Sequence, residues 1–254
     1  MNMNSHRLNS GLTDFDNATG GLAGGHLITI AGRPAMGKTA FAITLMVNIG
    51  IEQQIPVAFF SIEMCNIKIV KHILKNWSFY DFDCQSVDSE DIKHTNYQQE
   101  LCKLSESPIY LDDTPSISIN EIEDKITSLI SNYGVKVVFI DYLQLIRGFE
   151  ENPDDIMRRL KAIAIEKEIC IISLSQLYNK RIPSEEYEFD DSFFKDGTNA
   201  IMNNCDIVAL LYRPYVYNDD AEMRFLKGQK HKNNIIPLSF IRDQAMFTAR
   251  CSDD

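Results

Sequence analysis

The chain has 254 residues, a length that suits one sizeable α/β domain and leaves little room for two. Its composition, 44% hydrophobic and 24% charged, is that of an ordinary globular protein. Its formal net charge of −11 argues against a general nucleic-acid binder, so any contact with DNA should be local or shared among subunits around a channel. No apolar run approaches the ~18 residues of a membrane span, and no secretory signal begins the chain. Six scattered cysteines without a Cys-x-x-Cys pair argue against zinc and disulfides, so we expect a cytoplasmic protein that does not contact membranes.

Short apolar runs rich in β-branched residues alternate with helical patterns along the first two thirds of the chain. This alternation predicts βαβ units and a parallel sheet. The predicted strands are Leu27–Ala31, Val57–Ser61, Pro108–Leu111, Lys136–Ile140 and Ile169–Leu174. The predicted helices cover about 38–50, 64–77, 119–132 and 154–168, the third with Ser118 as its cap. Because the strands are almost continuously hydrophobic, we expect helices on both faces of the sheet.

The last quarter of the chain has a different character. Four short strands joined by turns are predicted, at Ile207–Tyr212, Met223–Leu226, Ile235–Ile241 and Met246–Ala249. We expect them to extend the same sheet in antiparallel fashion, within a single α/β domain over residues 1–254. The polar segments 147–155 and 179–204 have little pattern, and we interpret both as mobile loops.

A phosphate-binding pattern, GxxxxGK[ST], follows the first predicted strand. Its residues are Gly32, Arg33, Pro34, Ala35, Met36, Gly37, Lys38 and Thr39. The glycines let backbone amides turn toward phosphate oxygens, and the helix that follows points its positive end at them. Lys38, expected to face solvent in the crevice, would contact the β- and γ-phosphates of ATP, and the Thr39 hydroxyl would bind Mg²⁺. The strand and helix around the pattern favour this interpretation over a glycine-rich turn with a solvated lysine.

A second magnesium ligand is predicted at Asp141. It ends the apolar strand Val137–Ile140, which is the Walker B arrangement. An aspartate that caps a turn is the alternative, and the presence of the P-loop favours the metal ligand. Tyr142 follows Asp141, so the group that orients the attacking water must come from elsewhere.

Glu63 is the best candidate for that group. It follows the strand Val57–Ser61, and we expect this strand to lie beside the P-loop strand and to end in the same crevice. A carboxylate there would position water for in-line attack on the γ-phosphate. A solvated glutamate at a helix start, favoured by the helix dipole, is equally compatible with the spacing.

Two further strand ends carry polar side chains. Gln176 follows the strand Ile169–Leu174 and is either a sensor of the γ-phosphate or an ordinary surface amide. Asp112 and Asp113 also end a strand, but the sequence Asp-Thr-Pro-Ser at 113–116 is typical of a turn.

Together these residues resemble the C-terminal motor domain of the DnaB-type replicative helicases, a RecA-like P-loop NTPase. The resemblance covers nearly the whole chain. Its most specific parts are the Arg-Pro-x-Met-Gly-Lys-Thr form of the P-loop and the Asp-Tyr-Leu-Gln-Leu run at 141–145. Other matching stretches are Thr13–Asp16, Gly20–Leu22, Ser61–Met64, Leu160–Ala162, Ser173–Leu177, Tyr212–Arg213 and Val216–Tyr217.

The resemblance implies a motor that couples Mg-ATP hydrolysis to 5′→3′ translocation on single-stranded DNA and to duplex unwinding. It implies a hexameric ring, with a helicase loader or primase as possible partners. It also makes Glu63 the catalytic glutamate and Gln176 the γ-phosphate sensor.

The resemblance extends to residues that act between subunits and on DNA. In the family a Lys-x-Arg pair from the neighbouring subunit reaches the γ-phosphate, and the matching residues here are Lys230 and Lys232. Lys232 departs from the pattern, because a lysine cannot make the planar two-pronged contact of a guanidinium. In the loop that resembles the DNA-contacting loop of the family, Lys195 and the backbone around Asp196 and Gly197 would contact the phosphates of a single strand.

Two other functions remain open on the residues alone. A RecA- or KaiC-like ATPase in recombination or regulation would share the fold and the nucleotide site, although the two specific motifs favour the helicase motor. A low-activity ATP- and DNA-binding subunit would fit Lys232 and the lack of a counterpart to the family's N-terminal domain and linker helix before Ser10, and the loop at 147–155 is also shorter than in the family. The intact Lys38, Thr39, Glu63, Asp141 and Gln176 argue against this alternative. The chain would then be either a piece of a longer protein or a short relative with weaker assembly.

Overall fold

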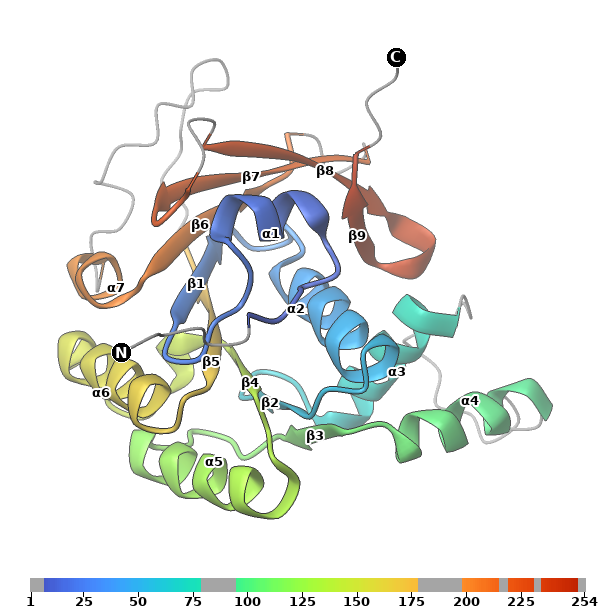
Figure 1. Ribbon diagram of the computed structural model, residues 1–254, viewed down its shortest axis with the longest axis horizontal. Helices are drawn as coiled ribbons and strands as arrows, with labels where there is room; N and C mark the ends of the chain where they lie inside the picture. Colours follow the sequence, from blue (N-terminus) through green and yellow to red (C-terminus); the bar gives the residue numbers. More distant parts are fainter. Residues whose placement is uncertain (1–6, 79–94, 178–197, 215–218, 231–233, 251–254) are drawn as a thin grey trace.

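A single nine-stranded sheet runs through the protein in the computed structural model, which describes residues 7–78, 95–177, 198–214, 219–230 and 234–250 (Figure 1). The strand order is β3-β2-β4-β5-β1-β6-β7-β8-β9. The strands are β1 Leu27–Gly32, β2 Val57–Ser61, β3 Ile109–Asp112, β4 Val137–Asp141, β5 Cys170–Gln176, β6 Ile207–Tyr212, β7 Asp220–Lys227, β8 Ile235–Ile241 and β9 Met246–Ala249.

The predicted division of the sheet is confirmed, with one correction. Strands β3, β2, β4, β5 and β1 are parallel, and β7, β8 and β9 are antiparallel. Strand β6 was expected in the antiparallel part, but it runs parallel to β1. The antiparallel extension therefore begins at β7, because the long connection from β5 returns the chain to the amino edge of the sheet before β6 starts.

Helices cover the central strands on both sides (Figure 1). They are α1 Thr13–Thr19, α2 Lys38–Val47, α3 Asn66–Ser78, α4 Thr95–Glu106, α5 Ile119–Tyr133, α6 Pro153–Glu166 and α7 Thr198–Asn204. A π-helical turn, Asn48–Glu52, extends α2, and 3₁₀ turns lie at Leu143–Leu145 and Arg242–Gln244. Residues of α1, α2 and α3 form one buried core with the sheet, and residues of α5, α6 and α7 form the other. The strands β1, β2 and β4 are buried along their whole length, as their continuous hydrophobicity predicted.

Helix α5 shows how local sequence fixes an element. Ser118 is its N-cap and forms a capping box with Glu121, and Gly134 ends the helix in the left-handed conformation at φ 70°. Ile122 and Ile126, one turn apart, are fully buried against the sheet. The predicted cap and helix are both present.

Both segments interpreted as mobile loops contain regular structure. Residues 198–204, assigned to a loop, form α7. In the segment 147–155, the Arg147 amide donates to the Ile117 carbonyl, Phe149 is buried, and α6 begins at Pro153. Helices α1 and α7 are only seven residues long, so neither provides enough turns for a helical period to show in the sequence. Residues 179–197 lie outside the described part of the chain.

Candidate active site

The P-loop joins β1 to α2 at the carboxyl edge of the sheet. Ala35 and Gly37 have positive φ angles of 64° and 91°. A Cβ atom at Gly37 would lie 3.0 Å from ring carbons of Phe247, and one at Gly32 would lie 2.9 Å from the Leu211 carbonyl oxygen. Both glycines are therefore sterically required, and the loop turns its backbone around a cradle that suits an anion at the N-terminus of α2.

Lys38 lies inside this cradle. Its side chain is folded back, and its Nζ donates to the Arg33 carbonyl oxygen at 3.0 Å. Lys38 is only 8% exposed, so the expectation that it faces solvent is wrong. Burial lowers the pKa of Lys38, while the charges of Asp141 and Glu63 raise it. The ammonium group is thus held by the loop backbone at the place where a phosphate oxygen would replace the carbonyl.

Thr39 and Asp141 meet across 102 residues of sequence. The Thr39 hydroxyl donates to Asp141 Oδ2 at 2.7 Å, and Asp141 is 1% exposed. Burial raises the pKa of Asp141 to about 6, the Thr39 hydrogen bond lowers it, the charge of Glu63 raises it and that of Lys38 lowers it. A hydroxyl and a carboxylate in contact beside a phosphate cradle form the oxygen donor set that magnesium prefers, so these residues fit the ion.

Glu63 is exposed and lies two residues after the end of β2. Its charge raises the pKa of both Asp141 and Lys38. Strand β2 was expected beside the P-loop strand, but β4 and β5 lie between them. The end of β2 instead contacts the end of β4 at Asp141, because Ser61 and Asp141 are register partners and the Ile62 amide donates to the Asp141 carbonyl at 2.9 Å.

Gln176 lies next to the first glycine of the P-loop. It is the register partner of Gly32, and the Leu177 amide donates to the Gly32 carbonyl at 3.1 Å. Gln144 positions this strand end, since its Nε2 donates to the Ser175 hydroxyl at 2.9 Å and its Oε1 accepts from the Gln176 amide at 3.3 Å. Sequence reasoning assigned Gln144 no role of its own, although it lies in the run at 141–145 that carries the family resemblance.

Asp112 and Asp113 serve the framework, and the predicted turn is present. Asp112 Oδ1 accepts from the Thr114 amide at 3.0 Å, and its other carboxylate oxygen pairs with Lys125. Asp113 Oδ2 accepts from the Asn66 amide at 2.8 Å and thereby caps the start of α3.

Arg213, the residue that follows β6, also contacts the P-loop. The Arg213 amide donates to the Met36 sulfur at 3.4 Å, and the Arg213 guanidinium lies over the Phe240 ring at 4.0 Å. Tyr212–Arg213 is one of the stretches that match the family, but sequence reasoning assigned Arg213 no contact with the P-loop, because it is 177 residues from Met36.

Of the residues predicted to act between subunits and on DNA, Lys230 is the one that the described part of the chain includes. Lys230 follows β7, whose Lys227 is the register partner of Val208 near the amino end of β6. The Lys230 amide donates to the Ala18 carbonyl at 2.8 Å, and its ammonium group lies over Gly20 at the end of α1. Lys230 is thus at the sheet edge opposite the P-loop of its own chain. Lys195, Asp196, Gly197 and Lys232 lie outside the described residues.

Comparisons with known proteins agree on the family. The family model described as the DnaB-like helicase C-terminal domain matches residues 7–249. The replicative DNA helicase DnaB of Geobacillus stearothermophilus is 32% identical over 254 residues, which covers 94% of this chain and 55% of the relative. The chain thus spans about half the length of this curated relative.

Solved structures agree on the fold. One solved ATPase domain superposes with a TM-score of 0.80 at 24% identity, covering 96% of this chain and 91% of that one. A DnaB-like replicative helicase, described together with its interactions with primase, superposes with a TM-score of 0.83 at 25% identity over 98% of this chain and 65% of that one. Among the described residues, no helix has the length and apolarity needed to cross a membrane. On the match over residues 7–249 and the relatives it resembles, the chain belongs to the DnaB-like helicase C-terminal domain family.

Proposed function

We propose that this chain is the motor domain of a replicative DNA helicase, which hydrolyses Mg-ATP and uses the energy to move along single-stranded DNA and separate a duplex. Membership of a helicase ATPase family implies nucleotide binding. The observation that carries the proposal is the contact between Thr39 and Asp141 at the mouth of the glycine cradle, with Lys38 held beside it. The two motifs at the P-loop and at 141–145, together with the family match, favour a helicase over a RecA- or KaiC-like regulator.

The cradle residues would each have a defined task. The backbone of Gly32–Thr39 would surround the β- and γ-phosphates, and Lys38 would exchange its bond to the Arg33 carbonyl for a phosphate oxygen. Thr39 and Asp141 would hold magnesium, which neutralises charge that develops on the phosphates during transfer.

Glu63 would orient the attacking water. Its exposed carboxylate acts electrostatically on both Asp141 and Lys38, which favours a place for it beside the γ-phosphate. Gln176, beside Gly32, would sense that phosphate.

The position of Lys230 favours a site shared between subunits. Because Lys230 lies at the edge opposite its own P-loop, it would reach a γ-phosphate only in a neighbouring subunit. A hexameric ring provides such a neighbour, and Lys232 would supply the second cation there. We propose Lys195, Asp196 and Gly197 as the contact with single-stranded DNA, and a helicase loader or primase as further partners.

The test is the substitution Glu63→Gln. It should leave ATP affinity intact and lower ATP turnover by roughly 10²–10⁴-fold, because the carboxylate acts on water in the transition state and not on bound nucleotide. Nucleotide binding is measured with a fluorescent ATP analogue, and turnover by phosphate release with and without single-stranded DNA. Glu166→Gln, an exposed glutamate on α6, is the matched control and should behave as wild type.

Two results would contradict the proposal. Full turnover by Glu63→Gln at saturating ATP would remove Glu63 from the reaction. Very slow turnover by the wild type, with normal ATP and DNA binding, would favour the low-activity subunit that Lys232 suggests, and a fork-unwinding assay would then show no strand separation.

A further inference from the structure

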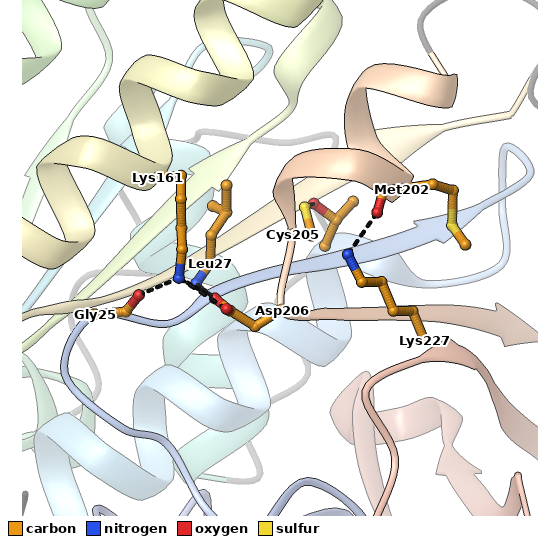
Figure 2. A network of polar contacts seen from close by, with 8 residues as sticks. Gly25, Leu27, Lys161, Met202, Cys205, Asp206 and Lys227 are labelled. Atoms are coloured by element: carbon orange, nitrogen blue, oxygen red, sulfur yellow. Dashed lines mark hydrogen bonds and ion pairs between the residues drawn. The ribbon is translucent and has the colours of Figure 1, made fainter. Parts of the chain in front are cut away.

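The strand that leads into the P-loop is fixed at its amino end. The Leu27 amide donates to Asp206 Oδ2 at 2.7 Å, and Lys161 Nζ donates to the same oxygen at 2.6 Å and to the Gly25 carbonyl at 2.7 Å (Figure 2). At its carboxyl end β1 enters the P-loop, where Gly37 has a φ of 91°. Because glycine has the widest choice of backbone conformations, Gly37 needs support from its surroundings to keep this one.

The ring of Phe247 provides that support. Two of its carbons lie 3.0 Å from the position of a Cβ atom at Gly37, so the ring packs against this glycine. It is fully buried and meets the Phe41 ring of α2 edge to face, with the centroids 5.5 Å apart. Phe247 is the second residue of β9, the edge strand of the sheet. The placement of β9 therefore affects the shape of the phosphate cradle.

The hydroxyl group of Thr44 connects β9 to the helix that follows the P-loop. Thr44 lies in α2 and is 1% exposed. Its Oγ1 donates to the Ala40 carbonyl at 3.0 Å and accepts from the Phe247 amide at 3.2 Å and from Asn76 Nδ2 at 3.1 Å. A hydroxyl group has one proton to donate and two lone pairs that accept, so all of its hydrogen-bonding capacity is used. One side chain thus joins α2, β9 and α3.

The amide group of Asn76 makes the second connection. Asn76 lies in α3 and is 3% exposed. Its Nδ2 donates to the Ala245 carbonyl at 3.2 Å as well as to Thr44, and the opposite orientation of the amide would place Oδ1 against that carbonyl. Oδ1 itself has no hydrogen-bond partner among the residues that the structure describes. Because a buried acceptor without a partner lowers stability, stability alone does not account for this amide.

Thr44 and Asn76 hold a strained turn from both sides. Ala245 lies in the left-handed region, at φ 46° and ψ 42°, which a residue with a Cβ atom rarely adopts. Such a conformation persists where the surrounding structure imposes it. Asn76 binds the Ala245 carbonyl, and Thr44 binds the amide of Phe247 further along the same turn. These two contacts therefore fix the turn that brings the Phe247 ring to Gly37.

We propose that Thr44 and Asn76 are positioning residues of the nucleotide site. They hold residues 245–247 in place, so that the Phe247 ring keeps Gly37, and with it the phosphate cradle, in the shape that binds Mg-ATP. The inference rests on the proposed function, because it assigns a role at the nucleotide site. Neither side chain touches the nucleotide in this role, and both act through Phe247.

The test uses three variants and one control in the full chain. Thr44→Val removes the hydroxyl group and keeps the size of the side chain, whereas Thr44→Ser keeps the hydroxyl group. Asn76→Leu removes both hydrogen-bond donors at similar volume. Thr127→Val is the matched control, because the Thr127 hydroxyl on α5, at the other face of the sheet, also donates to the carbonyl four residues earlier, that of Glu123, at 2.9 Å. The dissociation constant of a fluorescent ATP analogue with Mg²⁺ is measured for each variant, at a temperature where its urea unfolding curve shows it to be folded.

Thr44→Val and Asn76→Leu should raise this dissociation constant by roughly five- to a hundredfold, the usual range of coupling between separate sites. The physical reason is that Gly37 loses the ring that holds its conformation, so a smaller fraction of the free protein has the cradle in the binding shape. Thr44→Ser and Thr127→Val should bind the analogue as the wild type does. Wild-type affinity in folded Thr44→Val would overturn the proposal, and so would an equal loss of affinity in Thr44→Ser or Thr127→Val.

A double-mutant cycle with Phe247→Leu separates positioning from a general loosening of the fold. Phe247→Leu should itself weaken binding, and Thr44→Val should cause no further loss in the Phe247→Leu chain, because the hydroxyl group acts through the ring. Fold-changes that multiply in the double variant would overturn the proposal in favour of a purely structural role. If Thr44→Val does not fold, the same cycle with Asn76→Leu decides the question.

Failure of the proposed function gives a different pattern. A wild type that does not bind Mg-ATP would overturn the nucleotide site and the inference together. A wild type that binds Mg-ATP, with fold-changes that multiply in the cycle, would overturn the inference alone and leave the proposed function unaffected.

Discussion

The proposed role of Asp141 in binding magnesium opposes the stability of the fold. Its carboxyl group is buried beside Thr39 Oγ1, and burial raises its pKa to about 6 from the ordinary value of 3.8. Ionisation of Asp141 is therefore less favourable in the folded chain than in the unfolded chain. Above pH 6 this difference destabilises the protein without nucleotide by on the order of 1–3 kcal/mol.

Asp141→Asn should accordingly make the nucleotide-free protein more stable while it abolishes magnesium-dependent ATP binding. Well below about pH 4 the carboxyl group is protonated in both states, so the variant gains nothing there. The gain should grow as pH rises from about 4 to 6, the interval between the unfolded and folded pKa values, and stay constant above it. Urea unfolding of both proteins across this range measures the difference.

The exposed Asp155 supplies the control for this experiment, since Asp155→Asn should show no comparable pH-dependent gain. Addition of Mg-ATP should reverse the order of stability, because only the wild type binds it. A wild type that is more stable than Asp141→Asn at pH 7 without nucleotide would contradict the assignment of a destabilising carboxylate.

Helix α5 allows the contribution of a cap to be measured. Ser118→Ala removes the acceptor for the Glu121 amide and the hydroxyl that donates to Glu121 Oε2, and should lower the free energy of unfolding by about 1 kcal/mol. ATP affinity should not change, since no contact among the described residues joins Ser118 to the P-loop. Chemical denaturation and nucleotide titration give the two quantities.

Ser128→Ala on the same helix is the matched control. Ser128 is exposed in the third turn, where alanine is the better helix former, so this variant should be as stable as wild type or slightly more stable. Equal destabilisation by both substitutions would show that the cap is not what Ser118 contributes.

On the proposed function, the arrangement of the sheet makes contact between subunits necessary for catalysis. The P-loop lies at the carboxyl edge of the central strands, and Lys230 lies at the amino edge. On the proposed function, one chain supplies Glu63 and its neighbour supplies Lys230 and Lys232 to each site. ATP turnover per subunit should therefore rise with protein concentration as subunits meet.

A mixing experiment tests the shared site. Glu63→Gln and Lys232→Ala chains should each be nearly inactive, and a mixture should recover activity at interfaces that pair an intact Glu63 with an intact Lys232. Lys232→Arg should keep or raise the rate, because a guanidinium matches two phosphate oxygens better than an ammonium does. A mixture without recovery, together with wild-type turnover that does not depend on concentration, would show that each chain contains a complete site.

Much of this protein could be predicted from its sequence. The P-loop is eight consecutive residues whose steric requirements are local, so Gly32 and Gly37 marked it without knowledge of the fold. The strands β2, β6, β8 and β9 have the predicted bounds, because apolar runs between turns depend on neighbouring residues. The cap at Ser118 is equally local.

Other features depend on which distant segments pack together, and no local pattern records that. The placement of β4 and β5 between β2 and β1 brings Asp141, and not β2 itself, into contact with the P-loop. Lys38 is buried because its side chain folds back onto the P-loop carbonyl of Arg33. The contact of Arg213 with Met36 follows from the pairing of β6 with β1. Helix α7 is too short to show a period, and its existence depends on the contacts that Asp206 and Lys227 make with other elements. Chemistry that resides in consecutive residues can be read from the sequence, whereas chemistry assembled from strand ends depends on the order of the strands.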